Sequence, residues 1–276
     1  MKREHSLRRR LHSLETLSEA IGAMKSLSAL HFRSARTALP AAHAYRDGIE
    51  QALAATGLHQ SEATGNAILL IAADLGLCGG YYSQAAAARL EHHQRLAAHR
   101  LYCVGFRPVS TFKKSGISVD REYTAPTSVS DLTELLLRLG EDLLIDYLGG
   151  EFGTLNLVFA RFGGVGEFTP TCIRLLLIDV PNSNPETKAS TYVTPDHLAA
   201  VAIREYLYIR LFQAALDSLA SERSARLVAT EAAGEWLSEK TAAARQLLAS
   251  IRQEAATQAV LDIAATAKRR RQNREL

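Results

Sequence analysis

The sequence lacks any run of eighteen apolar residues, and its basic start MKREHSLRRR leads into no apolar stretch of the kind that secretory signals carry. A helix that crosses a bilayer needs about 20 consecutive apolar residues, and a signal peptide needs a shorter apolar core of its own. Lipid-attachment motifs are missing as well. We therefore expect a cytoplasmic protein that meets a membrane only through its partners.

Cysteine is scarce in this chain. Cys78, Cys103 and Cys172 are odd in number, widely spaced and without a C-x-x-C pair. Disulfide frameworks and zinc sites need paired or closely spaced cysteines, so neither is expected. The sequence around Cys78 offers no histidine or positive charge that would activate its thiol. We expect three packed thiols in a reducing compartment.

Catalytic and metal-binding motifs are missing too. His92, His93 and His99 occur without an H-E-x-x-H motif, and adjacent histidines on a helix point about 100° apart. No catalytic triad, acid–base pair or cofactor fingerprint can be assembled from the sequence. We expect no metal, no cofactor and no independent enzyme.

Charge of one sign does not dominate, since the net charge is only +3. Basic residues gather near the two ends, at 8–10 and 268–271, which favours solvated helix ends over a nucleic-acid site. Acidic residues of segment 131–148 lie between leucines, as in a helix that covers a sheet. These acids are expected to be solvated: Glu134, Glu141, Asp142 and Asp146.

The sequence does contain a long helix-forming segment at each end, residues 1–56 and 195–276. At 1.5 Å per residue, ~55 and ~75 residues span roughly 80 and 110 Å, far more than an average helix of about 11–12 residues. Such helices need a partner, so we expect them to pair as an antiparallel coiled coil. Pro40 is expected to mark a kink or local boundary, and Thr194 with Pro195 to start the second helix.

The first segment carries apolar residues at heptad spacing. Leu7, Leu14 and Ile21 recur every seven residues, and Leu17 and Met24 follow the second and third of them by three. This a/d-like pattern predicts a seam against one partner helix.

The second segment changes character along its length. Its first half has two neighbouring apolar stripes, as expected of a helix that packs on a core. The stripes are Leu207, Leu211, Ala215 and Leu219, and Tyr208, Phe212 and Leu216. From Ser221 onward alanine dominates and Gly234 is the only glycine before Lys268, which predicts a slim, stiff rod.

Residues 66–180 alternate strand-like and helix-like segments. The expected order is strand 66–74, helix 81–96, strand 100–106, helix 131–148 and strands 154–162 and 171–180. This alternation predicts a Rossmann-like α/β domain whose sheet is parallel at first and ends in a hairpin with the turn GGVG. The polar stretch VPNSNPETKASTYVTP is expected to be a linker.

The glycine-rich turn DLGLCGGYY lies between an expected strand and helix, where a phosphate could bind a helix N-terminus. It matches neither G-x-G-x-x-G nor a P-loop, so a tight structural turn is favoured. The alternative is a nucleotide- or small-molecule-binding α/β protein with helical dimerisation arms.

Three motifs together resemble the gamma subunit, or central stalk, of the rotary F-type ATP synthase. In LETLSEAIGAMKSLSALHFRSAR the matching residues are Ala23, Met24, Ala29 and Arg33. The family's D-R-G-L-C-G-G motif is matched by Asp74, Gly76, Leu77, Cys78, Gly79 and Gly80. In SERSARLVATEAA and IRQEAATQAVLDI the matches are Ser221, Glu222, Ala225, Arg226, Ala229, Ala232, Arg252, Gln253, Thr257 and Ile263. The resemblance covers essentially the whole chain in order and spacing.

The chain also departs from the family pattern. Leu75 replaces an arginine of the glycine motif, Leu227 and Thr230 replace methionines, and Trp236 stands where a small polar residue is common. A basic tail follows the usual end. These differences are typical of a divergent branch, for which the alternative sodium-translocating rotary ATPases are one candidate; the coupling ion is left open.

The resemblance implies a shaft of paired helices in the cavity of a hexamer of three alpha and three beta subunits. The central domain would form a collar on the ring of c subunits, beside epsilon, at the cytoplasmic face of the bacterial inner membrane. Because an asymmetric shaft touches the three beta subunits differently, its rotation would exchange their nucleotide affinities. Ion flow would thereby be coupled to ATP synthesis or hydrolysis, with catalysis on the beta subunits.

By position, the resemblance implies that Met24, Lys25, Arg252 and Gln253 contact the beta subunit. The alternative for each is an exposed coiled-coil residue without a special role. Asp74 and residues 76–80 are implied to form a collar loop that either shapes the collar or contacts beta and epsilon. A coiled-coil adaptor unrelated to rotation would leave the third motif without an explanation.

Overall fold

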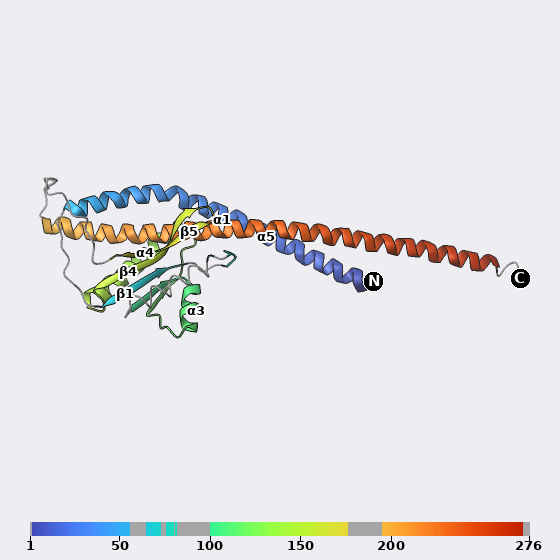
Figure 1. Cartoon of the computed structure of the whole chain (residues 1–276), viewed down its shortest axis with the longest axis horizontal. Coiled ribbons are helices and arrows are strands. Elements are labelled where there is room, and N and C mark those ends of the chain that lie inside the picture. The colour runs from blue at the N-terminus through green and yellow to red at the C-terminus, as the bar shows by residue number, and fades with distance from the viewer. Residues whose placement is uncertain are drawn as a thin grey trace. The chain divides into compact units, whose positions relative to one another are not determined.

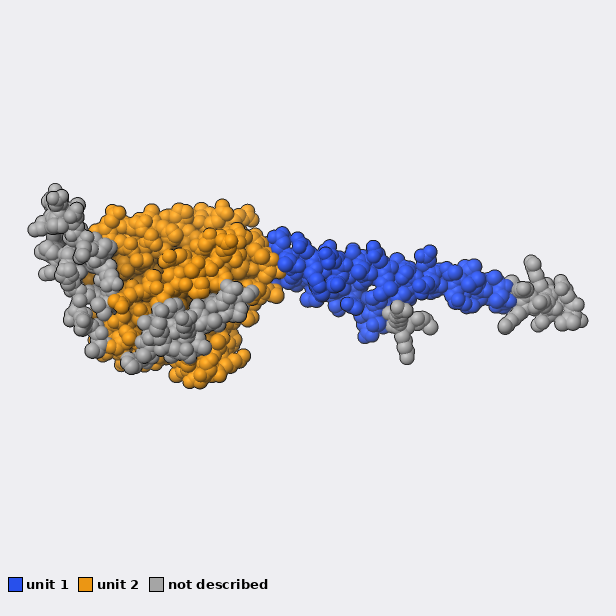
Figure 2. All heavy atoms as spheres, viewed as in Figure 1, with its two compact units in different colours: residues 1–26, 230–276 blue, residues 27–229 orange. Residues whose placement is uncertain are grey.

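The computed structural model describes residues 2–55, 65–72, 76–79, 81, 100–175 and 195–272. They form two compact units, one of residues 1–26 and 230–276 and the other of residues 27–229 (Figure 2). The two long helices contribute to both units, whereas the sheet belongs wholly to the second.

Helix α1, Lys2–Ala55, continues without a break through Pro40. The predicted local boundary at this residue is therefore wrong. Pro40 lies on an exposed side of the helix. The carbonyl of Arg36, which loses its helical partner because proline has no N–H, can be hydrated there.

Helix α5, Pro195–Gln272, is 78 residues long and begins at the predicted proline. Its residues 213–226 are buried without interruption. A helix that is buried all round is enclosed by other elements rather than laid on them by one face.

The sheet has five strands in the order β3-β2-β1-β4-β5 (Figure 1). The strands are β1 Asn66–Ile71, β2 Arg100–Val104, β3 Arg121–Tyr123, β4 Thr154–Gly164 and β5 Glu167–Arg174. The neighbouring pairs among β1, β2, β3 and β4 are parallel, and β5 pairs antiparallel with β4. The Rossmann-like sheet with a closing hairpin is thus confirmed.

Two helices lie between strands in the second half of the sheet domain. Helix α4, Asp131–Leu148, coincides with the predicted helix, whereas helix α3, Phe106–Lys114, and strand β3 are absent from the prediction. α3 has nine residues and contains Pro108, and β3 has three residues. Both elements are shorter than the stretches over which a pattern is recognised in a sequence, about 11–18 residues for a helix and about 4–8 for a strand.

Apolar side chains cover both faces of the sheet, because residues alternate in direction along a strand. Leu69 and Ile71 of β1 belong to the larger core, which includes residues of α1, α4 and α5. Leu70 belongs to the smaller core under α3, together with Cys103 and the half-buried Cys172. Burial on both faces is what a parallel sheet requires.

In the first unit α1 and α5 run antiparallel. Ion pairs join Glu4 to Arg252, Glu15 to Arg245 and Lys25 to Glu231. The residue numbers of the partners in α5 therefore decrease as those in α1 increase. The apolar seam consists of Leu14, Leu237 and Ala244, with Leu7, Leu11 and Ile21 packed against them. The predicted antiparallel pairing is confirmed.

One residue of the predicted seam is wrong, because Leu17 is 54% exposed. Leu7, Leu14 and Ile21 do belong to the seam. The further leucine of α1 that packs there is Leu11, four positions after Leu7. In a heptad seam the spacing between buried residues alternates between three and four. Leu11 and Leu17 each lie three residues from Leu14, so spacing alone permits either of them in the seam.

Several predicted features lie outside the described residues. They are the helix after Tyr81, the linker before Pro195, and His92, His93 and His99. The division of the chain into segments 1–56, 66–180 and 195–276 stays a prediction. No helix in the described ranges is long and apolar enough to span a bilayer.

Candidate functional site

The glycine-rich turn that follows β1 is described from Gly76 to Gly79, whereas Asp74 and Gly80 lie outside the described residues. Leu77 and Gly79 both have positive φ, 62° and 52°. A leucine in this left-handed region is strained, so its surroundings must hold it there. Leu77 is exposed, while Cys78 is buried as predicted.

Arg226 of α5 holds this turn in place. Its Nε donates to the carbonyl oxygen of Gly76 at 3.0 Å, and Cys78 Sγ approaches the same oxygen at 3.5 Å. Arg107 of α3 lies on another side, since a Cβ at Gly76 would come within 2.7 Å of its Nη2. A larger residue at position 76 would therefore displace the Arg107 side chain.

Arg226 also forms a buried ion pair with Glu222, one turn earlier on α5. Arg226 is 1% exposed and Glu222 is 4% exposed. The two charges compensate each other, and the other N–H groups of the guanidinium need acceptors such as the Gly76 carbonyl. Removing either partner would leave a buried charge.

Arg223 extends the same face of α5 to a second loop. Its Nη2 donates to the backbone carbonyl of Thr127 at 2.7 Å. The N–H groups of Thr127 and Ser128 donate to Asp131 of α4 at 3.0 and 2.9 Å. Hydrogen bonds from the Thr127 hydroxyl and from these N–H groups hold the pKa of Asp131 below its usual value, although burial opposes them.

Three further side chains of α5 contact the backbone of β4. Asp217, Ser218 and Ser221 are hydrogen-bonded to the backbone of Ala160 and Phe162. Together with the two arginines, they connect α5 to β4, to the turn after β1 and to the loop before α4. We call these five residues the α5 clamp: Asp217, Ser218, Ser221, Arg223 and Arg226.

A small pocket with a free volume of about 10 Å³ lies beside the clamp. Its lining residues are Ile71, Ala72, Ala125, Pro126, Ala215, Ser218, Leu219 and Glu222. Sheets of this topology bind ligands beyond the carboxyl ends of the strands where the strand order reverses, here between β1 and β4. Small-molecule pockets typically measure about 300–1,000 Å³. The described residues therefore leave no room for a nucleotide at this place.

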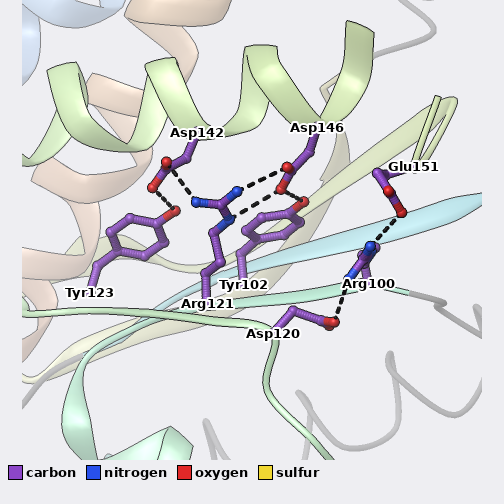
Figure 3. Close-up of polar contacts among 8 residues, drawn as sticks. All are labelled: Arg100, Tyr102, Asp120, Arg121, Tyr123, Asp142, Asp146 and Glu151. Carbon is purple, nitrogen blue, oxygen red and sulfur yellow. Dashed lines mark hydrogen bonds and ion pairs between the residues drawn. The ribbon is translucent and has the colours of Figure 1, made fainter. Parts of the chain in front are cut away.

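A separate polar cluster joins β2 and β3 to α4 (Figure 3). Arg121 is paired with Asp142 at 2.7 Å and with Asp146 at 2.9 Å. The hydroxyl of Tyr102 donates to Asp146 at 2.6 Å, and that of Tyr123 donates to Asp142 at 2.8 Å. Asp142 and Asp146 are thus not solvated as predicted, because they brace α4 against the edge of the sheet.

The protonation behaviour of this cluster fits a structural brace. Burial, reinforced by the hydrogen bond to a carboxylate, raises the pKa of both Tyr102 and Tyr123. Burial alone would raise the pKa of Asp146, but hydrogen bonds from Tyr102 and Arg121 outweigh it, and this pKa is lowered. The carboxylate is therefore held charged by its partners, which does not suit proton transfer.

The four residues predicted to contact a beta subunit lie in the first unit. Met24 is half-buried, and Lys25 Nζ lies 2.7 Å from Glu231. Arg252 Nε lies 3.4 Å from Glu4, and Gln253 is exposed. Since Lys25 faces residue 231 and Arg252 faces residue 4, the two predicted pairs lie at opposite ends of the seam and are not brought together.

The prediction names the turn but misses most of the clamp. Ser221, Glu222 and Arg226 match the family motif, yet the sequence gives them no physical role. A signal was available, because polar residues at 217, 218, 221 and 222 continue the apolar stripe of Leu211, Ala215 and Leu219. Polar residues on a face that is otherwise apolar indicate buried hydrogen-bonding side chains.

Comparison with known proteins agrees with this architecture. The family model described as ATP synthase matches residues 3–268. The ATP synthase gamma chain of Moorella thermoacetica is 28% identical over 287 residues, which cover 97% of this chain and 99% of that protein. The ATP synthase gamma chain of Desulforamulus reducens is 24% identical over 84% of this chain and 87% of that protein.

Solved structures show the same fold. A chain from the mitochondrial ATP synthase of Euglena gracilis, in an assembly of OSCP, F1 and c-ring, has a TM-score of 0.65 at 12% identity, covering 100% of this chain and 97% of that one. A chain from the central stalk and c-ring of the Tetrahymena thermophila enzyme has a TM-score of 0.59 at 16% identity, covering 78% and 99%. The chain described here belongs to the ATP synthase gamma-chain family, the central rotor stalk of F-type ATP synthases.

Proposed function

We propose that this chain is a non-catalytic rotor subunit that couples ion flow through a ring of c subunits to ATP synthesis or hydrolysis in a head of alpha and beta subunits. It contacts epsilon beside the c ring and works at the cytoplasmic face of a bacterial inner membrane. The observation that carries the proposal is the antiparallel pairing of α1 and α5 in the first unit, in a chain whose family match spans nearly its full length.

The surface of the first unit supports a role inside a partner. Its apolar seam is narrow, and residues 252–266 of α5 are all exposed. Among them, Val260, Leu261 and Ile263 are 65%, 57% and 70% exposed. Large apolar side chains so open to water favour burial by another protein.

We assign the contacts with beta to Met24, Lys25, Arg252 and Gln253. The side chains of Lys25 and Arg252 are 44% and 56% exposed, so their ion pairs within the chain leave them accessible. We assign the turn at residues 74–80 to the collar, where Leu77 offers an exposed apolar side chain to beta or epsilon.

The decisive experiment is co-expression with the alpha and beta subunits of the same genome, followed by mass determination and an ATPase assay. We expect one copy of this chain for each three alpha and three beta subunits. A chain truncated before Arg252 should lose ATP turnover. A homodimer that stays apart from alpha and beta would contradict the proposal.

The contact assignment is tested with the double variant Arg252→Ala/Gln253→Ala. We expect ATP turnover of the assembled head to fall by about threefold or more, which corresponds to about 0.7 kcal/mol. Arg245→Ala is the matched control, because it also removes an exposed ion pair between α5 and α1. Equal turnover in both variants would remove Arg252 and Gln253 from the contact.

A further inference from the structure

Strand β4 is longer than the strand that pairs with it on one side. β1 pairs with β4 only from Thr154 to Val158, whereas β4 continues to Gly164. On the opposite edge β4 stays paired with β5 over this extra length. Beyond Val158, β4 therefore has an edge that no strand covers in the described part of the chain.

The backbone groups of Ala160 and Phe162 point to this open edge. Pro170 stands opposite Ala160 in β5 and has no N–H to offer to the Ala160 carbonyl. Residues two apart in a strand direct their backbone groups to the same edge, so Phe162 shares the edge with Ala160. Buried backbone groups of this kind need partners.

Side chains of α5 supply those partners. Ser218 Oγ accepts from the Ala160 N–H at 3.3 Å, and Ser221 Oγ donates to the Ala160 carbonyl at 3.2 Å. Asp217 Oδ1 accepts from the Phe162 N–H at 3.3 Å. The three residues lie on one face of the helix, within four positions, and are 4%, 0% and 1% exposed in this order.

The side chains of α5 thus make the hydrogen bonds that a neighbouring strand would otherwise make to β4. These bonds have a mechanical consequence. Apolar contacts are non-directional, so they define the rotation and axial position of a packed helix less sharply than directional bonds do. Hydrogen bonds weaken steeply when the donor angle departs from linearity. Bonds from one helix face to fixed backbone groups therefore define both the rotation and the axial position of α5 on the sheet.

We propose that Asp217, Ser218 and Ser221 are positioning residues that fix the rotational setting of α5 on the collar sheet, so that torque passes between helix and collar without slip. This inference rests on the proposed rotor function. The arginines of the α5 clamp hold the adjoining loops, but the three bonds to β4 join the helix to the sheet itself.

The test uses the full complex, immobilised through its alpha and beta subunits, with an optical probe attached to the collar. The angular fluctuation of the probe is recorded while ATP turnover is paused. Ser218→Ala/Ser221→Ala removes two of the three bonds, so we expect the angular variance to rise about twofold or more, since each bond contributes comparably. The rate of ATP hydrolysis at low load should stay within the range of the wild type.

The matched control is Ser224→Ala. Ser224 is 0% exposed like Ser221, but its hydroxyl donates to the carbonyl of Ser221 within α5 instead of to the backbone of β4. We expect the control to keep the wild-type variance. A rise of equal size in both variants would show general loosening and would overturn the proposal, as would an unchanged variance in the double variant.

A second pair of variants covers the case in which the double serine variant does not assemble. Asp217→Ala removes the acceptor for the Phe162 N–H and should widen the fluctuation, whereas Asp217→Asn keeps an oxygen there and should restore it. Identical variance in the two would contradict the proposal. If the wild-type complex does not rotate at all, the rotor function itself fails, and this outcome is distinct from a rotating complex with unchanged variance.

Discussion

Helix α5 packs in two different ways in the two units. In the first unit its buried residues are sparse and spaced by three or four, as at Leu237, Thr241, Ala244 and Leu248, while the residues between them are exposed. In the second unit every residue from 213 to 226 is buried. One continuous helix is therefore half of a slim pair in one region and the centre of a domain in the other.

The two regions also differ in how charge is used. Around the seam the ion pairs are exposed, and such pairs typically contribute about 0–1 kcal/mol. In the second unit Arg226 and Glu222 are buried, and Arg226 also donates to the backbone carbonyl of Gly76. The difference teaches that helix propensity sets only the length of α5, whereas the side chains at each turn decide what the helix is fixed to.

Arg226→Ala tests this difference with the largest expected effect. The substitution leaves the Glu222 carboxylate buried without its ion pair and removes the donor to the Gly76 carbonyl. Breaking a buried pair typically costs about 3–5 kcal/mol. Urea unfolding followed by circular dichroism should show this loss in the second unit.

Arg245→Ala is the matching substitution in the first unit, where the ion pair with Glu15 leaves the arginine side chain 63% exposed. Its expected cost is at most about 0.5 kcal/mol. Equal losses for the two arginines would erase the distinction between the regions.

The sequence predicts the first unit and the sheet better than the clamp. Heptad spacing identifies Leu7, Leu14 and Ile21 because a two-helix seam repeats one simple contact many times. The strands around Leu69 and Val158 are recognisable because continuous apolar runs suit a sheet covered on both faces. Local pattern is enough in both cases.

The clamp depends on contacts between residues far apart in the chain. Ser221 meets Ala160 and Arg226 meets Gly76, which are 61 and 150 positions away. Polar residues that continue an apolar stripe indicate buried side chains, but they do not indicate which backbone groups those side chains bond. These side chains bond backbone groups that become available where β1 ends and where β4 continues beyond it. The periodicity of the sequence does not show that one strand is longer than its neighbour.

Leu14→Ala tests the choice of seam residues in the first unit. Leu14 is 9% exposed and packs with Leu237 and Ala244. Because a thin pair leaves room for partial collapse, we expect a cost of about 2 kcal/mol, at the low end for Leu→Ala. Amide hydrogen exchange of residues 7–25 should accelerate accordingly.

Leu17→Ala is the control on the exposed side of α1 and should change exchange little. If the two substitutions accelerated exchange equally, the seam would include Leu17 after all, and the steps of three drawn from the sequence would be right.

The smallest expected effect is a pH-dependent change in the free energy of unfolding. It should have opposite signs for a carboxylate of the second unit and one of the first. Burial raises the pKa of Asp217, and the Phe162 N–H, His43 and Arg161 offset this only in part. The charged carboxylate therefore costs stability above its folded-state pKa, and the cost fades as pH falls toward the unfolded value of about 3.9. Asp217→Asn keeps an acceptor without the charge, so it should be more stable than the wild type at pH 7, by a margin that shrinks on acidification.

Glu4 in the first unit should behave in the opposite way. Its hydrogen bond with Arg8 lowers its pKa, so Glu4 stabilises the fold above the unfolded pKa, and this contribution is lost as pH falls through the folded pKa. Glu4→Gln should therefore be less stable than the wild type at pH 7, again by a margin that shrinks on acidification. Urea unfolding of both variants between pH 7 and about pH 3 measures the two margins, because the contribution of Glu4 is lost only below its unfolded pKa. Margins of the same sign would mean that the two carboxylates affect stability in the same way, and burial of Asp217 would then not distinguish the second unit from the first.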